Sequence, residues 1–317
     1  MASEFELIGR YFSPATHQTR LAGGDDAALL EPRPGFALAV STDMLVEGVH
    51  FLPGTDPEAL GHKALAVNLS DLAAMGAEPR WVFLALALPE ADETWVAAFS
   101  RGLLQLARDH GVDLAGGDTT RGPRNLCLTI VGEVPVGRAL RRDRARAGHD
   151  VWLSGVTGEA AAGLAVAKGA LALPPVDAAR CLERLHRPQP RVALGRALAG
   201  IAAAAIDVSD GLLADAGHIA ERSNIAVVID AVRLPASSVL ATLPESARFA
   251  ATVAGGDDYE LCFTAEPAQR DAVQAAAATA GTPVTRIGRC EVGGGVRVLD
   301  RSGTERHLQS AGFDHFR

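Results

Sequence analysis

Aspartate recurs where apolar segments of this sequence end, each time beside Gly, Ser or Thr. Five segments share the pattern: Gly24-Asp25-Asp26, Ser41-Thr42-Asp43, Gly117-Asp118, Asp207-Val208-Ser209-Asp210 and Gly256-Asp257-Asp258. A carboxylate at a strand end is held by rigid backbone and can point into a shared cleft, and Mg²⁺ prefers such hard oxygen ligands. The pattern therefore predicts a site for several Mg²⁺ ions.

Each of these segments alone has an ordinary explanation, because Asp and Gly are common turn residues and Asp often caps the following helix. Five in one chain favour a functional explanation, since gathered carboxylates repel one another unless cations compensate their charge. Two or more Mg²⁺ ions would do so and would bridge the phosphates of ATP. Asp71, inside a predicted helix from Glu58 to Met75, could equally be a solvated helical acid.

The familiar nucleotide-binding signatures are absent from the sequence. It contains no GxxxxGK[ST] loop, no GxGxxG after a strand and no protein-kinase catalytic loop. Gly293-Gly294-Gly295 is typical of a hairpin turn rather than of a phosphate cradle. The acidic segments therefore carry the predicted chemistry.

Strand and helix patterns are mixed along the chain without strict βα repetition, which indicates an α+β fold. Strands are predicted at Phe36 to Val40, ending directly in Ser41-Thr42-Asp43, and at Val112 to Ala115, Leu126 to Val136, Ala204 to Val208 and Glu260 to Thr264. A length of 317 residues favours two domains. The basic stretch Arg138 to Arg146 is the predicted boundary, so we expect one domain in residues 1–138 and another in 149–317.

Composition excludes several classes of protein. A formal net charge of −8 argues against nucleic-acid binding, which depends on clustered Lys and Arg. The longest uncharged apolar run, Ala197 to Ile206, is shorter than the roughly 18 residues of a membrane span, and no secretory signal is visible. Four separated cysteines without a CxxC pair fit a reducing compartment. We therefore expect a cytoplasmic protein without a membrane segment.

Several motifs resemble, in order, those of the thiamine-monophosphate kinase family. They are Gly24-Asp25-Asp26-Ala27-Ala28, Ser41-Thr42-Asp43 through Gly48-Val49-His50-Phe51, Asn68-Leu69-Ser70-Asp71, Gly116-Gly117-Asp118-Thr119-Thr120, Asp207-Val208-Ser209-Asp210-Gly211 and Gly256-Asp257-Asp258-Tyr259-Glu260. The match runs from about residue 4 to the closing Gly312-Phe313-Asp314-His315-Phe316. The resemblance implies a two-domain α+β fold like that of aminoimidazole ribonucleotide synthetase (PurM-like), with the N-terminal domain pairing across a homodimer. It also implies transfer of phosphate from ATP to thiamine monophosphate.

Site residues follow from the resemblance position by position. It implies Mg²⁺ ligands at Asp26, Ser41, Thr42, Asp43, Asp71, Asp118, Asp207 and Asp210, with Asp43, Asp118 and Asp210 as the catalytic carboxylates. It implies ATP contacts at Gly117, Asp118, Arg142 and Ser209, and thiamine contacts at His50, Asp257 and Phe313. Asp257 stands where the family commonly has Glu, so its side chain is one methylene shorter.

The reaction is compatible with this set of residues. The acceptor is a phosphate monoester whose second pKa is about 6, so at neutral pH it is largely a dianion and needs no general base. Metal ions and an arginine can then supply positioning and charge neutralisation. From the residues alone, His50 could be a packing histidine, Arg142 a solvated charge and Phe313 a core residue.

Other functions remain open at this level. Selenophosphate synthetase would carry a reactive cysteine near its N-terminus, whereas the first cysteine here is Cys127. The hydrogenase-maturation relative would end in cysteine, whereas this chain ends Phe316-Arg317. Aminoimidazole ribonucleotide synthetase, or a non-catalytic sensor of magnesium nucleotides, stays as the alternative.

Overall fold

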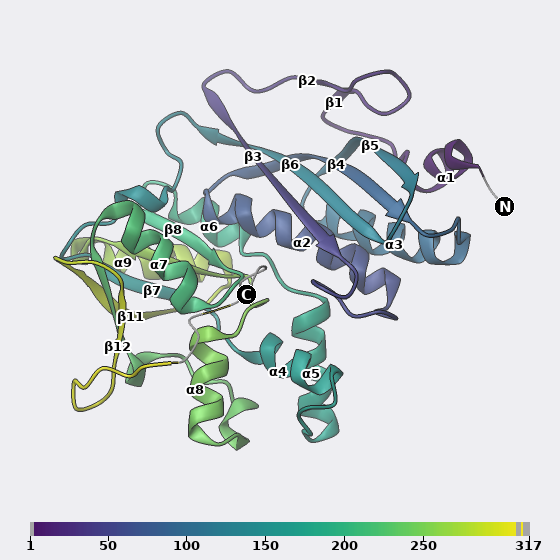
Figure 1. The fold of residues 1–317 in the computed structure, drawn as a ribbon. Coiled ribbons are helices and arrows are strands. Elements are labelled where there is room, and N and C mark those ends of the chain that lie inside the picture. The colour runs from purple at the N-terminus through teal and green to yellow at the C-terminus, as the bar shows by residue number, and fades with distance from the viewer. Residues whose placement is uncertain (1–2, 309–311, 313–317) are drawn as a thin grey trace. The chain divides into compact units, whose positions relative to one another are not determined.

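The structure, a computed structural model, describes residues 3–308 and Gly312, and the chain divides into two compact units (Figure 1). The first unit comprises the chain up to Leu72 together with Ala77–Gly137, and the second comprises Ala73–Gly76 together with the chain from Arg138 onward. The domain ranges 1–138 and 149–317 stay a prediction.

The N-terminal unit is built on a four-stranded sheet with the order β3-β6-β4-β5. Its elements are α1 (Glu4–Tyr11), β1 (Thr19–Leu21), β2 (Leu29–Leu30), β3 (Phe36–Val46), α2 (Pro57–Ala74), β4 (Glu78–Leu88), α3 (Glu93–Asp109), β5 (Asp113–Arg121) and β6 (Asn125–Pro135). Strand β6 pairs antiparallel with β3 and β4, and β4 pairs parallel with β5. Helices α2 and α3 lie along one face of this sheet (Figure 1).

Close packing of α2 against α3 depends on two glycines. A Cβ atom on Gly102 would lie 1.9 Å from the carbonyl oxygen of Glu58, and one on Gly61 would lie 2.1 Å from that of Phe99. Any side chain at either position would push the helices apart. The two glycines thereby set the distance between α2 and α3.

Strand β3 presents two different faces. Ser41, Asp43 and Leu45 are partly or fully buried, whereas the alternate residues Val40 and Met44 are 62% and 52% exposed. Since successive side chains of a strand point to opposite faces, the first set lies on the helix-covered face and the second on the other. The N-terminal sheet therefore carries exposed apolar side chains on the face opposite its helices.

Two segments that the sequence predicted as turns lie inside strands instead. Strand β3 continues beyond Val40 to Val46, and β5 continues through Gly117 and Asp118 to Arg121. The prediction was wrong because the polar residues pair in register: Ser41 to Asp43 lie opposite Ile130 to Leu128 of β6. A continuous ladder of hydrogen bonds overrides the turn preference of Asp and Gly.

Asp113 fixes the start of the chain to this sheet. Its carboxylate accepts hydrogen bonds from the N–H groups of His17 and Gln18 and from the hydroxyl of Thr19, at 2.7 to 3.1 Å. Burial alone would raise the pKa of Asp113, but these hydrogen bonds lower it below its usual value. Strand β1 is held in this way, and β1 and β2 together bracket the loop that contains Asp26.

The C-terminal unit contains a six-stranded sheet with the order β12-β9-β11-β7-β10-β8. Its strands are β7 (Asp150–Ser154), β8 (Ala204–Val208), β9 (Ala226–Asp230), β10 (Glu260–Ala265), β11 (Val284–Glu291) and β12 (Val296–Leu299). Its helices are α4 (Glu159–Ala167), α5 (Pro175–His186), α6 (Val192–Leu198), α7 (Leu212–Ser223), α8 (Glu245–Ala254) and α9 (Arg270–Ala280), and Arg142–Arg144 forms the short helix η1. All pairings are antiparallel except that of β12 with β9.

The core of this unit lies on one face of the sheet. Ile206, Val227 and Ile287 pack there with Ile219 of α7 and Val253 of α8, all at most 1% exposed. The neighbouring residues along each strand point to the opposite face, where Trp152 and Phe263 stack with ring centroids 6.2 Å apart. The sheet is thus apolar on both faces at β7 and β10.

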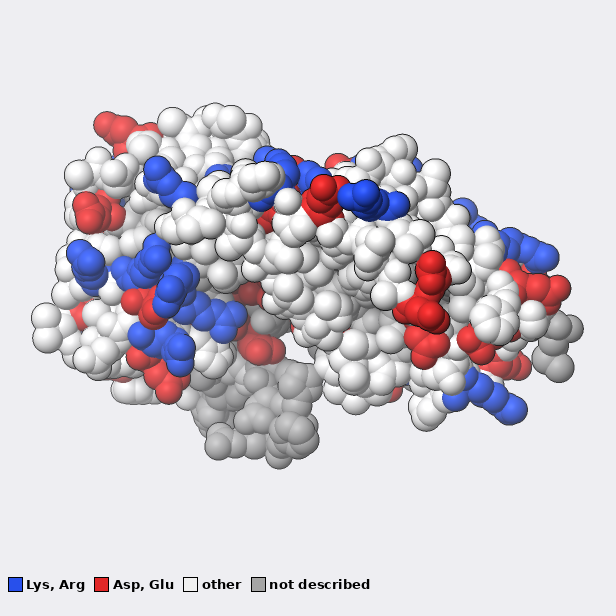
Figure 2. Space-filling view, turned by 90° about the horizontal axis from the view of Figure 1, so that it is seen from above, with Lys and Arg blue, Asp and Glu red and all other residues white. Residues whose placement is uncertain are grey.

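The surface carries charges of both signs. Figure 2 shows Lys and Arg side chains lying among Asp and Glu side chains on the face that it presents. Across the described residues, none of the helices is both long enough and apolar enough to span a membrane.

Candidate active site

Three of the predicted Mg²⁺ ligands lie on the helix-covered face of β3 or project toward it from α2. The hydroxyl of Ser41 donates a hydrogen bond to the Asp71 carboxylate, which projects from α2. Asp43 follows two residues after Ser41 and lies on the same face of β3. The structure therefore brings Ser41, Asp43 and Asp71 to one side of the sheet, and Asp71 contacts β3 rather than being simply a solvated helical acid.

Thr42 and Asp118 lie on the other face of the sheet. The Thr42 hydroxyl is 2.9 Å from that of Thr129 in β6. Met44 of β3 pairs with Cys127 of β6, Cys127 with Ala85 of β4, and Ala85 with Asp118 of β5. Residues paired across neighbouring strands point to the same face, so Asp118 lies on the same face as Met44. Because β3 and β5 are the two edges of the sheet, about 14 Å separates them. Within one chain, Thr42 and Asp118 share a face but do not meet.

Asp26 and His50 lie in connecting segments of the same unit. Asp26 is exposed, and its N–H donates to the Asp25 carboxylate at 2.8 Å. Half-buried His50 accepts a hydrogen bond at Nδ1 from the N–H of Val46, at 2.9 Å. The proton of the neutral ring consequently lies on Nε2. His50 thus has a structural contact as well as a predicted contact to substrate.

In the C-terminal unit the structure brings two acidic segments together. The N–H of Asp257 donates to the carbonyl of Ser209 and that of Tyr259 to the carbonyl of Val208, both at 2.8 Å. Asp257 and Tyr259 adopt left-handed φ angles of 68° and 51°, which cost free energy for residues other than glycine. This strained segment places Asp257 beside the turn that follows Asp207, itself 4% exposed in β8.

Asp215 is a residue of this site that the sequence did not reveal. One of its oxygens accepts hydrogen bonds from three consecutive backbone N–H groups, those of Ser209, Asp210 and Gly211, at 3.0 to 3.1 Å. The side chain is 2% exposed. Burial, followed by the negative charge of Asp210, raises the pKa of Asp215 to about 7, although the three hydrogen bonds act to lower it. Asp215 therefore fixes the turn that carries Ser209 and Asp210.

A sequence signal for Asp215 exists in retrospect. It lies four residues after Gly211 in the first turn of α7, where an acid can reach back to unpaired N–H groups. The sequence prediction rested on Asp207 and Asp210, which precede this helix.

Arg142 lies away from Ser209 along α7. Its carbonyl accepts a hydrogen bond from the hydroxyl of Ser223 at 2.6 Å, at the C-terminal end of that helix. Eleven helical steps of 1.5 Å place this end about 17 Å from the start of α7, which follows Ser209 and Asp210 directly. The exposed Arg142 side chain is thus not gathered with Ser209 in the structure. Phe313, the third predicted thiamine contact, lies outside the described residues.

The chemistry of these side chains fits Mg²⁺ even though they form no complete metal cage. Among residues 3–308 and Gly312, no three His, Cys, Asp or Glu side chains are grouped so that they could hold a metal ion together. Mg²⁺ commonly uses only one or two carboxylates and completes its octahedron with water and substrate phosphates. Ser41, Asp43 and Asp71 provide hard oxygen donors of that kind.

Comparison with known proteins identifies the class of fold and then the family. Residues 24–134 match the family described as AIR synthase related protein, N-terminal domain. This confirms the predicted α+β fold of the aminoimidazole ribonucleotide synthetase class.

Individual relatives resolve the family within that class. A thiamine-monophosphate kinase of Escherichia coli is 45% identical over 320 residues, covering 99% of this chain and 98% of the relative. The crystal structure of thiamine-monophosphate kinase from Stenotrophomonas maltophilia aligns with a TM-score of 0.84 and 52% identity, covering 89% of this chain and 91% of that one. A structure described as AaThiL complexed with AMPPCP and TMP aligns with a TM-score of 0.79 and 33% identity over 92% and 91% of the two chains. The chain belongs to the thiamine-monophosphate kinase family.

We predict that Asp215→Ala lowers the free energy of unfolding by about 3 kcal/mol, because three backbone N–H groups, that of Gly211 buried and those of Ser209 and Asp210 partly buried, lose their acceptor. Asp215→Asn, which keeps one carbonyl oxygen, should lose less. Denaturant titration measures both, with Asp271→Asn on the exposed first turn of α9 as the control. An Asp215→Ala protein as stable as the control would show that the turn does not depend on this carboxylate.

Proposed function

We propose that this protein transfers the γ-phosphoryl group of ATP to thiamine monophosphate, giving ADP and thiamine diphosphate. The observation that carries the proposal is near full-length similarity to thiamine-monophosphate kinases at up to 45% identity among curated relatives. The structural relative described with AMPPCP and TMP supports both substrates. The reaction is a direct in-line transfer between two anions.

The chain's own residues would position the reactants rather than exchange protons with them. The acceptor phosphate is largely a dianion at neutral pH and attacks without a base. We assign His50 and Asp257, with Phe313, to the thiamine moiety, and Ser209, Gly117 and Arg142 to ATP. The turn held by Asp215 keeps Ser209 and Asp210 in a fixed geometry, which is how a protein lowers the barrier of a transfer that depends on alignment.

Mg²⁺ is the proposed cofactor. When bound, it would neutralise the negative charge that the two phosphates bring together. The residues proposed to hold it are Asp26, Ser41, Thr42, Asp43, Asp71, Asp118, Asp207 and Asp210, of which Asp43, Asp118 and Asp210 lie nearest the transfer in the proposal. Ser41 supports this assignment, because its hydroxyl already orients the Asp71 carboxylate.

Gly117 has a structural role that must be weighed beside its proposed ATP contact. A Cβ atom at this position would lie 1.9 Å from the carbonyl oxygen of Leu84 in the neighbouring strand. The glycine is therefore required for β5 to pair with β4. Its backbone can still approach a phosphate, because the residue itself is exposed.

We also propose that the protein is a homodimer formed through the N-terminal sheet. The face opposite the helices exposes Leu38, Val40 and Met44, at 45%, 62% and 52%. An arrangement that places β5 of one copy beside β3 of its partner would bring Asp118 close to Thr42, which one chain keeps at opposite edges. A cytoplasmic location is proposed as well, in keeping with the four cysteine thiols, none of them in a disulfide.

The reaction is tested by a coupled assay of ADP release with thiamine monophosphate, thiamine, aminoimidazole precursors and selenide as acceptors. We expect release only with thiamine monophosphate, and Asp43→Asn should lower kcat at least about 100-fold because it removes a charge beside the transferred group. Asp109→Asn, an exposed acid at the end of α3, is the control. Release with an aminoimidazole precursor would favour a synthetase, nucleotide binding without turnover would favour a sensor, and near-normal kcat in Asp43→Asn would refute the role of Asp43.

The role of His50 can be separated from its bond to Val46. We expect His50→Ala to raise KM for thiamine monophosphate about tenfold and KM for ATP much less. In His50→Asn the side-chain carbonyl can still accept the hydrogen bond from the N–H of Val46. If His50→Asn restores the wild-type KM, the residue acts only through the backbone and does not contact the substrate.

For the dimer, we expect light scattering to give twice the chain mass of 32.9 kDa. Val40→Asp should reduce this to a folded monomer, because it buries a charge in the proposed interface. Val176→Asp, at an 80% exposed position of α5, should leave the mass unchanged. A Val40→Asp protein that keeps the doubled mass would place the interface elsewhere.

A further inference from the structure

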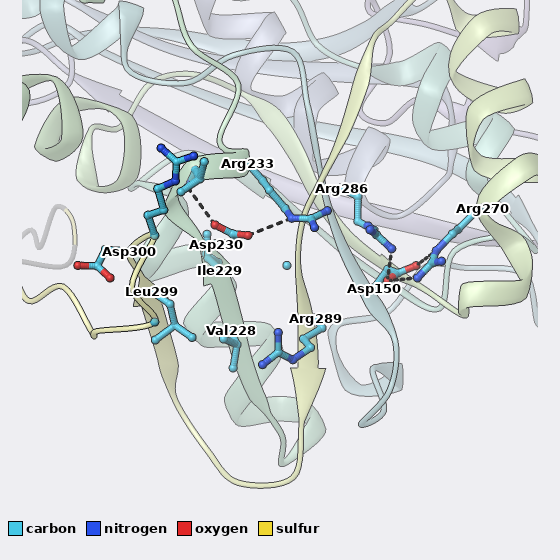
Figure 3. A pocket seen from close by; sticks show the side chains of 14 residues that line it. Asp150, Val228, Ile229, Asp230, Arg233, Arg270, Arg286, Arg289, Leu299 and Asp300 are labelled. Atoms are coloured by element: carbon cyan, nitrogen blue, oxygen red, sulfur yellow. Dashed lines mark hydrogen bonds and ion pairs between the residues drawn. The ribbon is translucent and has the colours of Figure 1, made fainter.

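An arginine-rich hollow of about 540 Å³ lies in the C-terminal unit beside β9, β11 and β12 (Figure 3). Its lining includes the guanidinium groups of Arg233, Arg270, Arg286, Arg289 and Arg301. The carboxylates among the lining residues are those of Asp150, Asp230 and Asp300. Five arginines against these three aspartates and Glu291, which pairs with Arg289, give this hollow a small local excess of positive charge in a chain whose net charge is −8.

Carboxylates hold several of these arginines in place without using all of their donors. Arg270 makes a two-pronged ion pair with Asp150, which is 5% exposed, at 2.6 and 2.9 Å. Arg286 reaches the same carboxylate at 3.5 Å, and Arg233 donates through Nε to Asp230 at 3.0 Å, as Figure 3 shows. A guanidinium has five N–H donors, so Arg233 and Arg286 each keep most of theirs.

Orientation by an acid lowers the entropic cost of binding an anion. The side chains of Arg233 and Arg286 remain 49% and 32% exposed, so solvent-borne ligands can reach them. Arg289 is fixed in a comparable way by Glu291 at 2.7 Å and is 62% exposed. The hollow thus has positioned, accessible donors that suit phosphate oxygens.

Apolar side chains lie beside these donors. Leu299 lines the hollow from β12 and Val232, also in the lining, is 61% exposed, whereas Val228 of β9 lies beneath them and is only 2% exposed. A cavity of several hundred Å³ that combines an apolar surface with a few charged groups is typical of sites for small organic ligands. Inorganic phosphate alone would leave this apolar surface uncovered.

We propose that the hollow binds an organic phosphate that carries two negative charges and a ring. The phosphate contacts Arg233, Arg286 and Arg289, and the ring lies against Val232 and Leu299. None of the residues assigned to phosphoryl transfer lines the hollow. The inference therefore stands independently of the proposed kinase reaction.

Calorimetric titration of the full chain with AMP tests this proposal, at about 25 mM salt to limit screening. EDTA is present, so that carboxylate sites have no metal through which to bind phosphate. We expect a Kd of about 1 mM or below for the wild type, and a loss of at least about tenfold in the double variant Arg233→Ala/Arg289→Ala, because charge-assisted donors are removed. The matched control is Arg20→Ala/Arg101→Ala, which removes two exposed arginines of the N-terminal unit.

Ribose 5-phosphate serves as a second probe that has the dianion but no aromatic ring, and we expect it to bind more weakly than AMP. Equal binding of AMP by the wild type and the double variant would overturn the proposal, as would an equal loss in the control or no binding by the wild type. Equal affinity for AMP and ribose 5-phosphate would refute the contact with the ring. Turnover of thiamine monophosphate by the double variant should stay at the wild-type rate, so failure here is distinguishable from failure of the kinase assignment.

Discussion

Carboxylates that gather around an anionic substrate repel one another, and the fold must hold them in place against that repulsion. Strand pairing, a serine hydroxyl and a fixed turn contribute to this. Asp43 is part of a strand paired along its whole length with β6, and Asp71 is held from α2 by the Ser41 hydroxyl. Asp210 belongs to a turn whose N–H groups all point to Asp215. Hydrogen bonds from a hydroxyl and from backbone amides orient these acids without adding a positive charge.

Hydrogen bonds from two segments also fix the turn that follows β8. The turn after β8 is clamped from two sides: the Asp215 carboxylate binds its amides, and the segment around Asp257 binds its carbonyls. The left-handed conformation of Asp257 and Tyr259 is the cost of that second contact. Such strain persists only where surrounding hydrogen bonds impose it. The geometry of this one short turn therefore lowers the free energy of unfolding of the C-terminal unit.

The sequence was sufficient to predict the α+β fold and the family, because the acidic motifs are long, follow one another in the same order as in the family, and are spread over the whole chain. It was insufficient for local geometry. Ser41 to Asp43 and Gly117 to Asp118 were predicted as turns from their composition, yet pairing with neighbouring strands makes them extended. That difference places Thr42 and Asp118 on the face opposite Ser41. Asp215 was missed because its role depends on how a helix begins. The other site assignments stay predictions.

The two faces of β3 have a consequence for how this protein can change over time. Ser41 and Asp43, which we assign to phosphoryl transfer, lie on one side, while Val40 and Met44, which we assign to the proposed dimer interface, lie on the other, and both sets alternate along the same eleven-residue ladder with β6. Inserting or deleting one residue would exchange the sides, because the side-chain period of a strand is two. On the proposed assignments, such a change would disturb catalysis and assembly together. A substitution can alter one set alone, whereas a change in length within β3 would move both sets at once.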